Sequence, residues 1–241
     1  MEKYRFYCQT ITKPDCELSG TEARHLASVL RLKKDEQVEL FDGRGVVADA
    51  MIKDISGKKV TLEIQNMRTV KQRANGRIII AVSIAKGERL DWLIEKCTEL
   101  GIDRISPVLF ERTVKFAAGA HTIQRWHNIS VSAAKQSGLN LLPVIDDPAP
   151  LKKVLNKLKI DYLSSDILLG LPDSQAEPIM KYSFRDNDII VLVGPEGGLT
   201  VEEQQVCLQA GSKPVRLTDS ILRVETAALA FASLLSAMRS C

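Results

Sequence analysis

Four mostly apolar runs in the C-terminal two thirds of this 241-residue chain constrain its fold most strongly. They lie at residues 78–82, 105–109, 167–171 and 189–193 and alternate with helical patterns, such as the apolar positions 90, 93, 94, 97 and 100. Strands that are apolar on both faces and alternate with helices are typical of a mainly parallel sheet covered on two sides. The sequence therefore predicts an α/β domain here.

The N-terminal part has a different pattern, in which short strands predominate. Strands are predicted at 38–41, 46–52 and 60–64, separated by Asp-Gly and Ser-Gly turn pairs. One helix precedes them, because Ser19 and Glu22 have the spacing of a capping box and apolar residues recur behind them at helical spacing. This combination predicts a small β-barrel domain.

The stretch 68–77 is poor in apolar residues and contains an Asn-Gly breaker, so we expect the boundary there, between domains 1–72 and 73–241. The net charge of +3 is too small to indicate a nucleic-acid partner by itself. However, residues 1–76 carry 14 Lys and Arg against 11 Asp and Glu, whereas the rest of the chain is balanced. The basic surplus therefore belongs to the N-terminal domain.

Several functional classes lose support from the sequence. No apolar run approaches the roughly 20 residues that span a bilayer, and the start lacks a secretory signal, so we expect a cytoplasmic protein without a membrane partner. The five cysteines form no CxxC pair, which argues against disulfides and a metal site. Hydrolase and metalloprotease motifs are absent, and the SxxK match at Ser132 to Lys135 is interpreted as helix.

The segment 43–48 fits the dinucleotide fingerprint GxGxxA. That fingerprint requires a helix to follow, so that the helix N-terminus can face the pyrophosphate. The residues that follow are instead typical of a strand, which favours a hairpin turn.

The strongest local feature is 189–200, an apolar strand that enters a glycine-rich turn and then a helix. Thr200 and Glu203 have capping-box spacing, so the turn is expected at the C-terminal edge of the sheet, where α/β folds bind ligands. Glu196 within the turn would repel phosphate and favours a positively charged ligand. A plain tight turn would also explain the glycines.

Two further segments carry candidate functional residues. Arg223 and Glu225 lie where a loop enters an Ala/Leu-rich helix, although Glu225 could simply complement the helix dipole. Lys86 and Arg89 begin a helix just after a strand, and Arg112, Lys135 and Gln136 follow in later segments. Solvated surface charges would give the same pattern.

Taken together, KGERLDWLIEKCTELG, ERTV, AAKQSG, VGPEGGLT and ILRVETAAL, in this order, resemble the RsmE family of ribosomal RNA methyltransferases within the SPOUT superfamily. The resemblance covers nearly the whole chain. It implies a SPOUT-type trefoil-knotted parallel-sheet domain, an N-terminal PUA-like RNA-binding barrel, S-adenosylmethionine (SAM) as cofactor and a homodimer. It also implies methylation of uridine N3 in 16S rRNA, with small-subunit rRNA or the assembled small subunit as partner.

The resemblance also implies positions for the donor site. They are Leu169, Gly170, Gly194, Glu196, Gly198, Leu217, Ile221, Leu222, Thr226 and Ala227. Many family members have LGPRILR where this chain has Leu217-Thr-Asp-Ser-Ile-Leu-Arg223, so the Gly-Pro-Arg part is missing from this loop.

RNA contacts are expected from two groups of residues. The basic N-terminal domain contributes Arg5, Arg24, Arg31, Lys33 and Lys34, and the family segments contribute Lys86, Arg89, Arg112, Lys135 and Gln136. For catalysis we hypothesise that Arg223 stabilises the uracil anion, while Glu225 orients Arg223 or helps to remove the N3 proton. Two alternatives stay open: a non-catalytic assembly factor, and a knotted methyltransferase that acts on another RNA.

Overall fold

The structure is a computed structural model that describes residues 4–85, 87–113, 119–174, 176–183 and 187–239. The chain forms two compact units, the first comprising residues 1–72 and 134–142 and the second comprising 73–133 and 143–241. The predicted boundary after residue 72 assigned residues 134–142 to the second domain. These residues instead pack within the first unit, where Ala134 is buried with Phe41 and Val47.

The first unit is built on a five-stranded sheet in the order β1-β3-β4-β5-β2. Its β1 and β3 are parallel, and the other neighbours are antiparallel. Its elements are β1 (Arg5–Tyr7), β2 (Asp15–Ser19), α1 (Gly20–Arg24), a π-helical turn (His25–Val29), β3 (Gln37–Phe41), β4 (Val46–Ser56) and β5 (Lys59–Thr69).

The hairpin interpretation of the GxGxxA segment is confirmed, because β4 begins at Val46 directly after the turn. Gly43 and Gly45 have φ values of 72° and 109°, which favour glycine. A Cβ on Gly45 would lie 2.2 Å from the carbonyl oxygen of Val70. The segment therefore closes a hairpin and binds no dinucleotide through a helix N-terminus.

The expected capping box at the start of α1 does not form. Ser19 is the N-cap residue, but its side chain makes no capping hydrogen bond. Glu22 instead accepts a hydrogen bond from the backbone N–H of Tyr7 at 3.0 Å and pairs with Lys135 at 2.9 Å. A charged partner within the same unit therefore takes the carboxylate away from the helix end.

The second unit contains an eight-stranded sheet, in which every pairing is parallel. The order is β11-β13-β10-β12-β6-β7-β8, with β9 also beside β7. Its elements are β6 (Ile78–Ser83), α2 (Arg89–Glu99), β7 (Arg104–Leu109), α3 (Ala120–Ser137), β8 (Val144–Ile145), β9 (Ala149–Pro150), α4 (Leu151–Asp161), β10 (Asp166–Gly170), β11 (Glu177–Pro178), a 3-10 turn (Ile179–Lys181), β12 (Ile189–Val193), α5 (Val201–Gln209), β13 (Lys213–Arg216) and α6 (Val224–Arg239). The predicted α/β class is confirmed.

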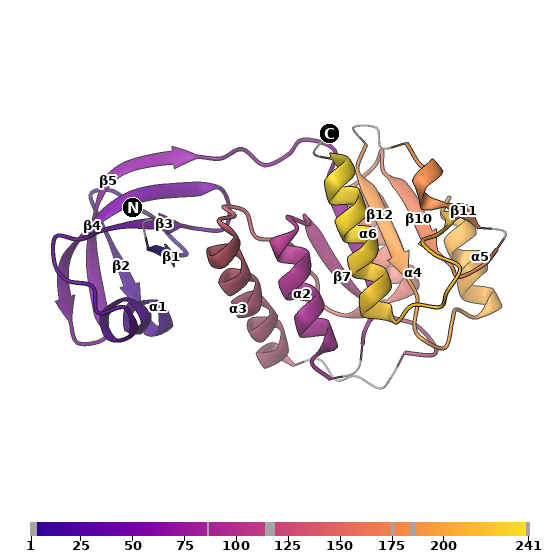
Figure 1. Cartoon of the computed structure of the whole chain (residues 1–241), viewed down its shortest axis with the longest axis horizontal. Helices are drawn as coiled ribbons and strands as arrows, with labels where there is room; N and C mark the ends of the chain where they lie inside the picture. Colours follow the sequence, from indigo (N-terminus) through magenta and orange to yellow (C-terminus); the bar gives the residue numbers. More distant parts are fainter. Residues whose placement is uncertain (1–3, 86, 114–118, 175, 184–186, 240–241) are drawn as a thin grey trace. The chain divides into compact units, whose positions relative to one another are not determined.

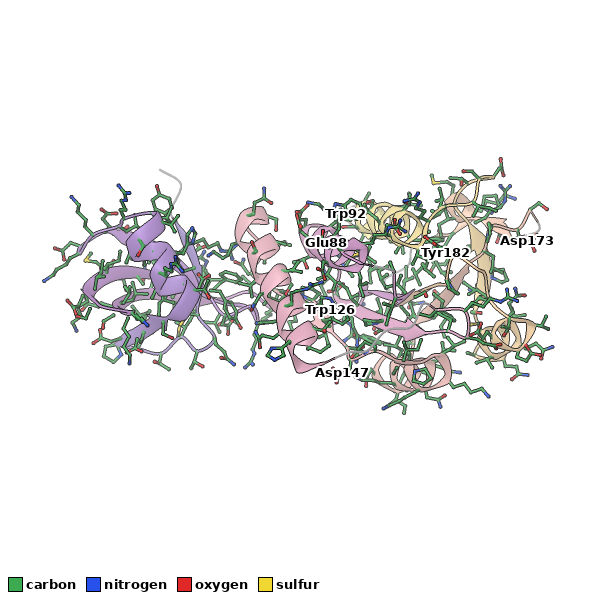
Figure 2. The ribbon with its side chains drawn as sticks, turned by 90° about the horizontal axis from the view of Figure 1, so that it is seen from below. Glu88, Trp92, Trp126, Asp147, Asp173 and Tyr182 are labelled. Carbon is green, nitrogen blue, oxygen red and sulfur yellow. The ribbon has the colours of Figure 1, made fainter. Side chains whose placement is uncertain are left out.

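Both faces of this sheet are buried. Along β6, Ile78 and Ile80 pack in one core with α2 and α6, whereas Ile79 packs in the other core with α4 and α5. Figure 1 shows α2 and α6 side by side on the sheet, and the two helices are in contact. Trp126 of α3 is buried in the core that contains α2 and α6, and its Nε1 donates a hydrogen bond to Asp91 of α2 at 3.0 Å. Trp92 of α2 is instead exposed (Figure 2).

Strand register brings three loops to one edge of the sheet. Gly170 at the end of β10 pairs with Val193 at the end of β12 on one side and with Val215 of β13 on the other. Because the strands are parallel, the loops that leave their carboxyl ends meet above the same edge.

Among the described residues, no helix is sufficiently long and apolar to cross a membrane.

A buried ion cluster joins β7 to the segment before β9. Arg104 donates two hydrogen bonds to Asp146, at 2.7 and 2.8 Å, and Ser106 and Lys157 also donate to the same carboxylate. Burial alone would raise the pKa of Asp146, but the hydrogen bonds from Arg104, Lys157 and Ser106 outweigh it and hold the pKa below its usual value. The ionised carboxylate therefore stabilises the folded unit.

We expect Asp146→Asn to lower the free energy of unfolding by about 3 kcal/mol at pH 7, because it leaves a buried Arg104 without its main partner. The folded-state pKa of Asp146 is depressed, so this stabilisation is present above the unfolded pKa near 4 and is lost as pH falls through the folded pKa. The difference between the variants should shrink in acid. Urea denaturation followed by tryptophan fluorescence measures it, since both tryptophans lie in this unit.

The matched control is Asp161→Asn, which removes the second carboxylate on Arg104. Asp161 is 38% exposed, so its loss should cost about 1 kcal/mol or less. Equal destabilisation by the two variants would contradict the role given to burial.

Candidate functional site

A pocket of about 290 Å³ lies where the loops after β10, β12 and β13 meet the start of α6. Its walls are mostly apolar, with backbone groups of the glycine-rich loop between them. The lining residues are Gly170, Leu171, Pro172, Val193, Gly194, Pro195, Glu196, Gly197, Gly198, Leu199, Val215, Leu217, Thr218, Ser220, Ile221, Leu222, Val224, Ala227 and Phe231. Because most of the positions that the family resemblance implies for the donor site line this pocket, we call it the donor pocket.

Two glycines shape the donor pocket because a side chain added at either position would press against a neighbouring side chain. A Cβ on Gly170 would lie 2.7 Å from Cε2 of the buried Phe231 ring, and one on Gly194 would lie 3.1 Å from Cγ of Leu199. The first distance is shorter than the 3.0 Å below which real Cβ atoms essentially never approach, so Phe231 would have to shift, whereas the second would require Leu199 to give by a few tenths of an ångström. The strand ends therefore leave space for backbone groups to reach a ligand.

Hydrogen bonds fix the glycine-rich loop at its C-terminal end and at Gly197. The predicted capping box at α5 is confirmed: Thr200 accepts from the N–H of Glu203, and Glu203 accepts from the N–H of Thr200 at 2.9 Å. On the other side, Arg112 donates from Nη1 to the carbonyl oxygen of Gly197 at 2.7 Å. The loop thus has little freedom to collapse into the pocket.

The loop that lacks the family's Gly-Pro-Arg also lines the donor pocket. The Thr218 hydroxyl donates a hydrogen bond to the carbonyl oxygen of Ser220 at 3.0 Å, and both residues line the donor pocket. Asp219 pairs with Arg216 of β13, which also donates to the carbonyl oxygen of Ala176. Local hydrogen bonds and an ion pair therefore order this loop without a proline.

An ion network borders the donor pocket. Arg89, at the start of α2, pairs through Nη1 with Glu196 at 3.0 Å and through Nε with Glu225 at 3.6 Å. Glu225 is 9% exposed, and its Oε2 has no hydrogen-bond partner among the described residues. Arg89 is thus the cation that links the glycine-rich loop to α6.

The structure places most of the expected donor residues together. Those that line the donor pocket are Gly170, Gly194, Glu196, Gly198, Leu217, Ile221, Leu222 and Ala227. Leu169 and Thr226 do not line it. The Leu169 side chain packs in the core with Leu192, because alternate residues of β10 face opposite sides, and Thr226 is exposed on α6.

Of the two roles hypothesised for Glu225, the one in which it orients Arg223 has no contact to support it, because the two residues do not pair. Glu225 lies in the first turn of α6 and faces inward, whereas Arg223 precedes the helix and is exposed. Residues two apart in a helical turn point in different directions, so the carboxylate reaches Arg89 instead. Both neighbours of Arg223, Leu222 and Val224, line the donor pocket.

The expected RNA-contact residues separate into three groups. Arg24, Arg31, Lys33, Lys34 and Gln136 are exposed, and within the described part of the chain none of the four basic residues forms an ion pair. Arg5 is 9% exposed and pairs with Glu39, and Lys135 pairs with Glu22, so these two cations stabilise the first unit. Arg89 and Arg112 border the donor pocket, and Lys86 lies outside the described residues.

Phe231 and Pro172 also line the donor pocket, although neither was predicted from the sequence. Phe231 lies seven residues into α6, which the sequence identified only as an Ala/Leu-rich helix. Its partner Gly170 comes from a distant strand, and no local signal connects the two.

Family models and solved structures of known proteins point to the same family. Residues 72–236 match the model of the RNA methyltransferase domain, and residues 18–65 match that of the RNA methyltransferase PUA domain. The crystal structure of a ribosomal RNA small subunit methyltransferase E from Neisseria gonorrhoeae, bound to S-adenosyl methionine, is 30% identical and has a TM-score of 0.86 over 98% of each chain. The chain belongs to the ribosomal RNA small subunit methyltransferase E family.

Other relatives agree with this assignment. A methyltransferase from Legionella pneumophila, in complex with bound SAM, has a TM-score of 0.88 and 29% identity over 98% of each chain. The ribosomal RNA small subunit methyltransferase E of Buchnera aphidicola is 29% identical over 92% of this chain and 87% of its own length. The family resemblance inferred from the motifs is therefore confirmed.

Proposed function

We propose that this protein transfers the methyl group of SAM to a base of small-subunit ribosomal RNA. The observation that carries the proposal is the apolar, backbone-lined donor pocket at the carboxyl ends of β10, β12 and β13, in a chain of this methyltransferase family. Carboxyl ends of parallel strands are where α/β folds bind ligands.

The residues of the donor pocket fit SAM. Gly170 and Gly194 leave the space that a Cβ would fill, and apolar side chains such as Leu217 and Phe231 can enclose the adenosine. Glu196 at the pocket border favours the positive charge of the sulfonium and amino groups. When bound, SAM supplies an electrophilic methyl group on a positively charged sulfur.

For the acceptor we propose N3 of a uridine in 16S rRNA, as the family resemblance implies. The N3 proton must leave before this nitrogen can attack, so negative charge develops on the uracil ring. Arg223, exposed between two pocket-lining residues, is our candidate to stabilise that charge. Equal losses of donor binding and turnover in Arg223→Ala would contradict this role.

We also propose the knotted topology and the homodimer that the family resemblance implies. The sheet order places β13 between β11 and β10, so the chain returns to the interior of the sheet late in the sequence. Trp92 of α2 is 43% exposed and lies near α6 (Figure 2), which supports an apolar contact with a second copy. Because its substrate is ribosomal, we place the protein in the cytoplasm.

A non-catalytic assembly factor is the alternative from another functional class, and a knotted enzyme acting on another RNA is a second. The intact glycine-rich loop and the buried Oε2 of Glu225, which has no hydrogen-bond partner among the described residues, favour an enzyme, because a binding factor would have no need of either.

We expect labelled methyl to pass from SAM to small-subunit particles that lack the modification, and mass spectrometry of the RNA to identify N3-methyluridine. Particles from a strain deleted for this gene provide the substrate, and fully modified particles are the control. Donor binding without transfer would contradict the substrate, and absence of donor binding would favour the assembly factor.

We expect Gly170→Ala to lower SAM affinity at least about tenfold, since the new Cβ must displace the Phe231 ring toward the donor pocket. Isothermal titration calorimetry measures the dissociation constant. Gly119→Ala is the matched control, because no heavy atom of the described residues lies within 4 Å of its added Cβ. Unchanged affinity in Gly170→Ala would show that the ligand does not use this end of the pocket.

We expect Lys33→Glu with Lys34→Glu to weaken RNA binding and to reduce the slope of log affinity against log salt by roughly one per lost phosphate contact. Both side chains are exposed. Lys58→Glu with Lys13→Glu gives the same charge change elsewhere in the unit and should have a smaller effect. Loss of SAM binding in the first variant would contradict an RNA-specific role.

A further inference from the structure

A second cavity, of about 360 Å³, lies directly beside the donor pocket. Its lining residues are Ser83, Ile84, Ala85, Arg89, Arg112, Thr113, Pro195, Glu196, Gly197 and Val224. Pro195, Glu196, Gly197 and Val224 line both cavities, so the two share one wall. A group bound in the second cavity would therefore lie next to a ligand in the donor pocket.

A pair of hydroxyl groups lies on one side of this cavity. Ser83 ends β6, and Thr113 follows the adjacent strand β7; their oxygens are 3.1 Å apart. Thr113 Oγ1 also accepts from the backbone N–H of Phe110 at 2.8 Å. Two hydroxyls have two hydrogens, and their mutual bond uses one, so among the described residues one donor stays for a ligand. Ser83 itself is 1% exposed.

Two guanidinium groups contribute further donors. Arg89 uses Nη1 for Glu196 and Nε for Glu225, and Arg112 uses Nη1 for Gly197. A guanidinium has five N–H donors, so within the described part of the chain the Nη2 groups of both arginines have hydrogens without a partner. The buried carboxylate of Glu225 holds Arg89 in place, which makes Glu225 a positioning residue.

We propose that the second cavity receives the target base of the RNA, with Arg89, Arg112 and Ser83 recognising its carbonyl oxygens. This inference rests on the proposed function. Uracil carries carbonyl oxygens on both sides of N3, and loss of the N3 proton spreads negative charge over them. Donors fixed around the ring stabilise that charge without having to reorganise. The target base would have to leave its stack to enter the cavity.

The chemistry of the transfer balances within this arrangement. The N3–H proton leaves to solvent, the new bond forms between N3 and the methyl carbon, and the bond from that carbon to sulfur breaks with its electron pair left on sulfur. Cytosine would present an amino group in place of one carbonyl oxygen. That amino group would oppose the donors of Arg89 and Arg112, so the cavity selects uracil.

The test measures methyl transfer to unmodified small-subunit particles and, separately, the dissociation constant for SAM. In Ser83→Val the added methyl groups occupy the cavity, and we expect kcat/KM for the particles to fall at least about tenfold with SAM affinity unchanged within about twofold. Ser83→Ala removes one donor and should cost about fivefold. Arg89→Gln should lower kcat about a hundredfold.

Ser130→Ala is the matched control, because Ser130 is a fully buried serine of the same unit that lines neither cavity. It should leave kcat/KM within about twofold of the unsubstituted protein.

If Arg89→Gln does not fold, the Ser83 variants still decide the question. Wild-type transfer with no loss in Ser83→Val would overturn the base cavity, as would parallel losses of SAM binding and transfer. Absence of transfer in the wild type would instead overturn the proposed function.

Discussion

Burial of both faces of the parallel sheet is the constraint on which the rest of the second unit depends. Strands such as β12 have no exposed face, so polar chemistry can occur only at the strand ends and in the loops. Register then decides which loops meet: Gly170 beside Val193 and Val215 brings three of them together. The close approach of Phe231 to Gly170 seals the floor of the resulting pocket.

Charge within the site is organised by pairs that come from distant parts of the chain. Arg89 links the glycine-rich loop to α6 through Glu196 and Glu225, and Arg112 holds the loop by its carbonyl oxygen. A buried carboxylate with one unsatisfied oxygen costs stability, and such costs are tolerated where function needs them. The proposed base cavity lies where these pairs leave N–H groups that have no partner in the part of the chain that the structure describes.

The first unit shows how similar basic residues can have different roles. Arg5 and Lys135 are enclosed by carboxylates and aromatic rings of Phe41 and Phe6, so they contribute to packing. Lys33 and Lys34 stay exposed and are available to phosphate groups. Charge counting along the sequence located the basic surplus, but it could not separate these groups, because burial depends on residues more than one hundred positions away.

The sequence by itself determined the α/β class, the four strands β6, β7, β10 and β12, the capping box at Thr200 and the family, because apolar periodicity, capping and ordered motifs are local signals. Only the tertiary structure decided that Glu225 pairs with Arg89, that residues 134–142 pack in the first unit, and that a second cavity lies beside the donor pocket. Periodicity reports which side of an element is buried. The packing of the elements decides which distant residue contacts that buried side, because side-chain volume and charge must be matched across the whole core.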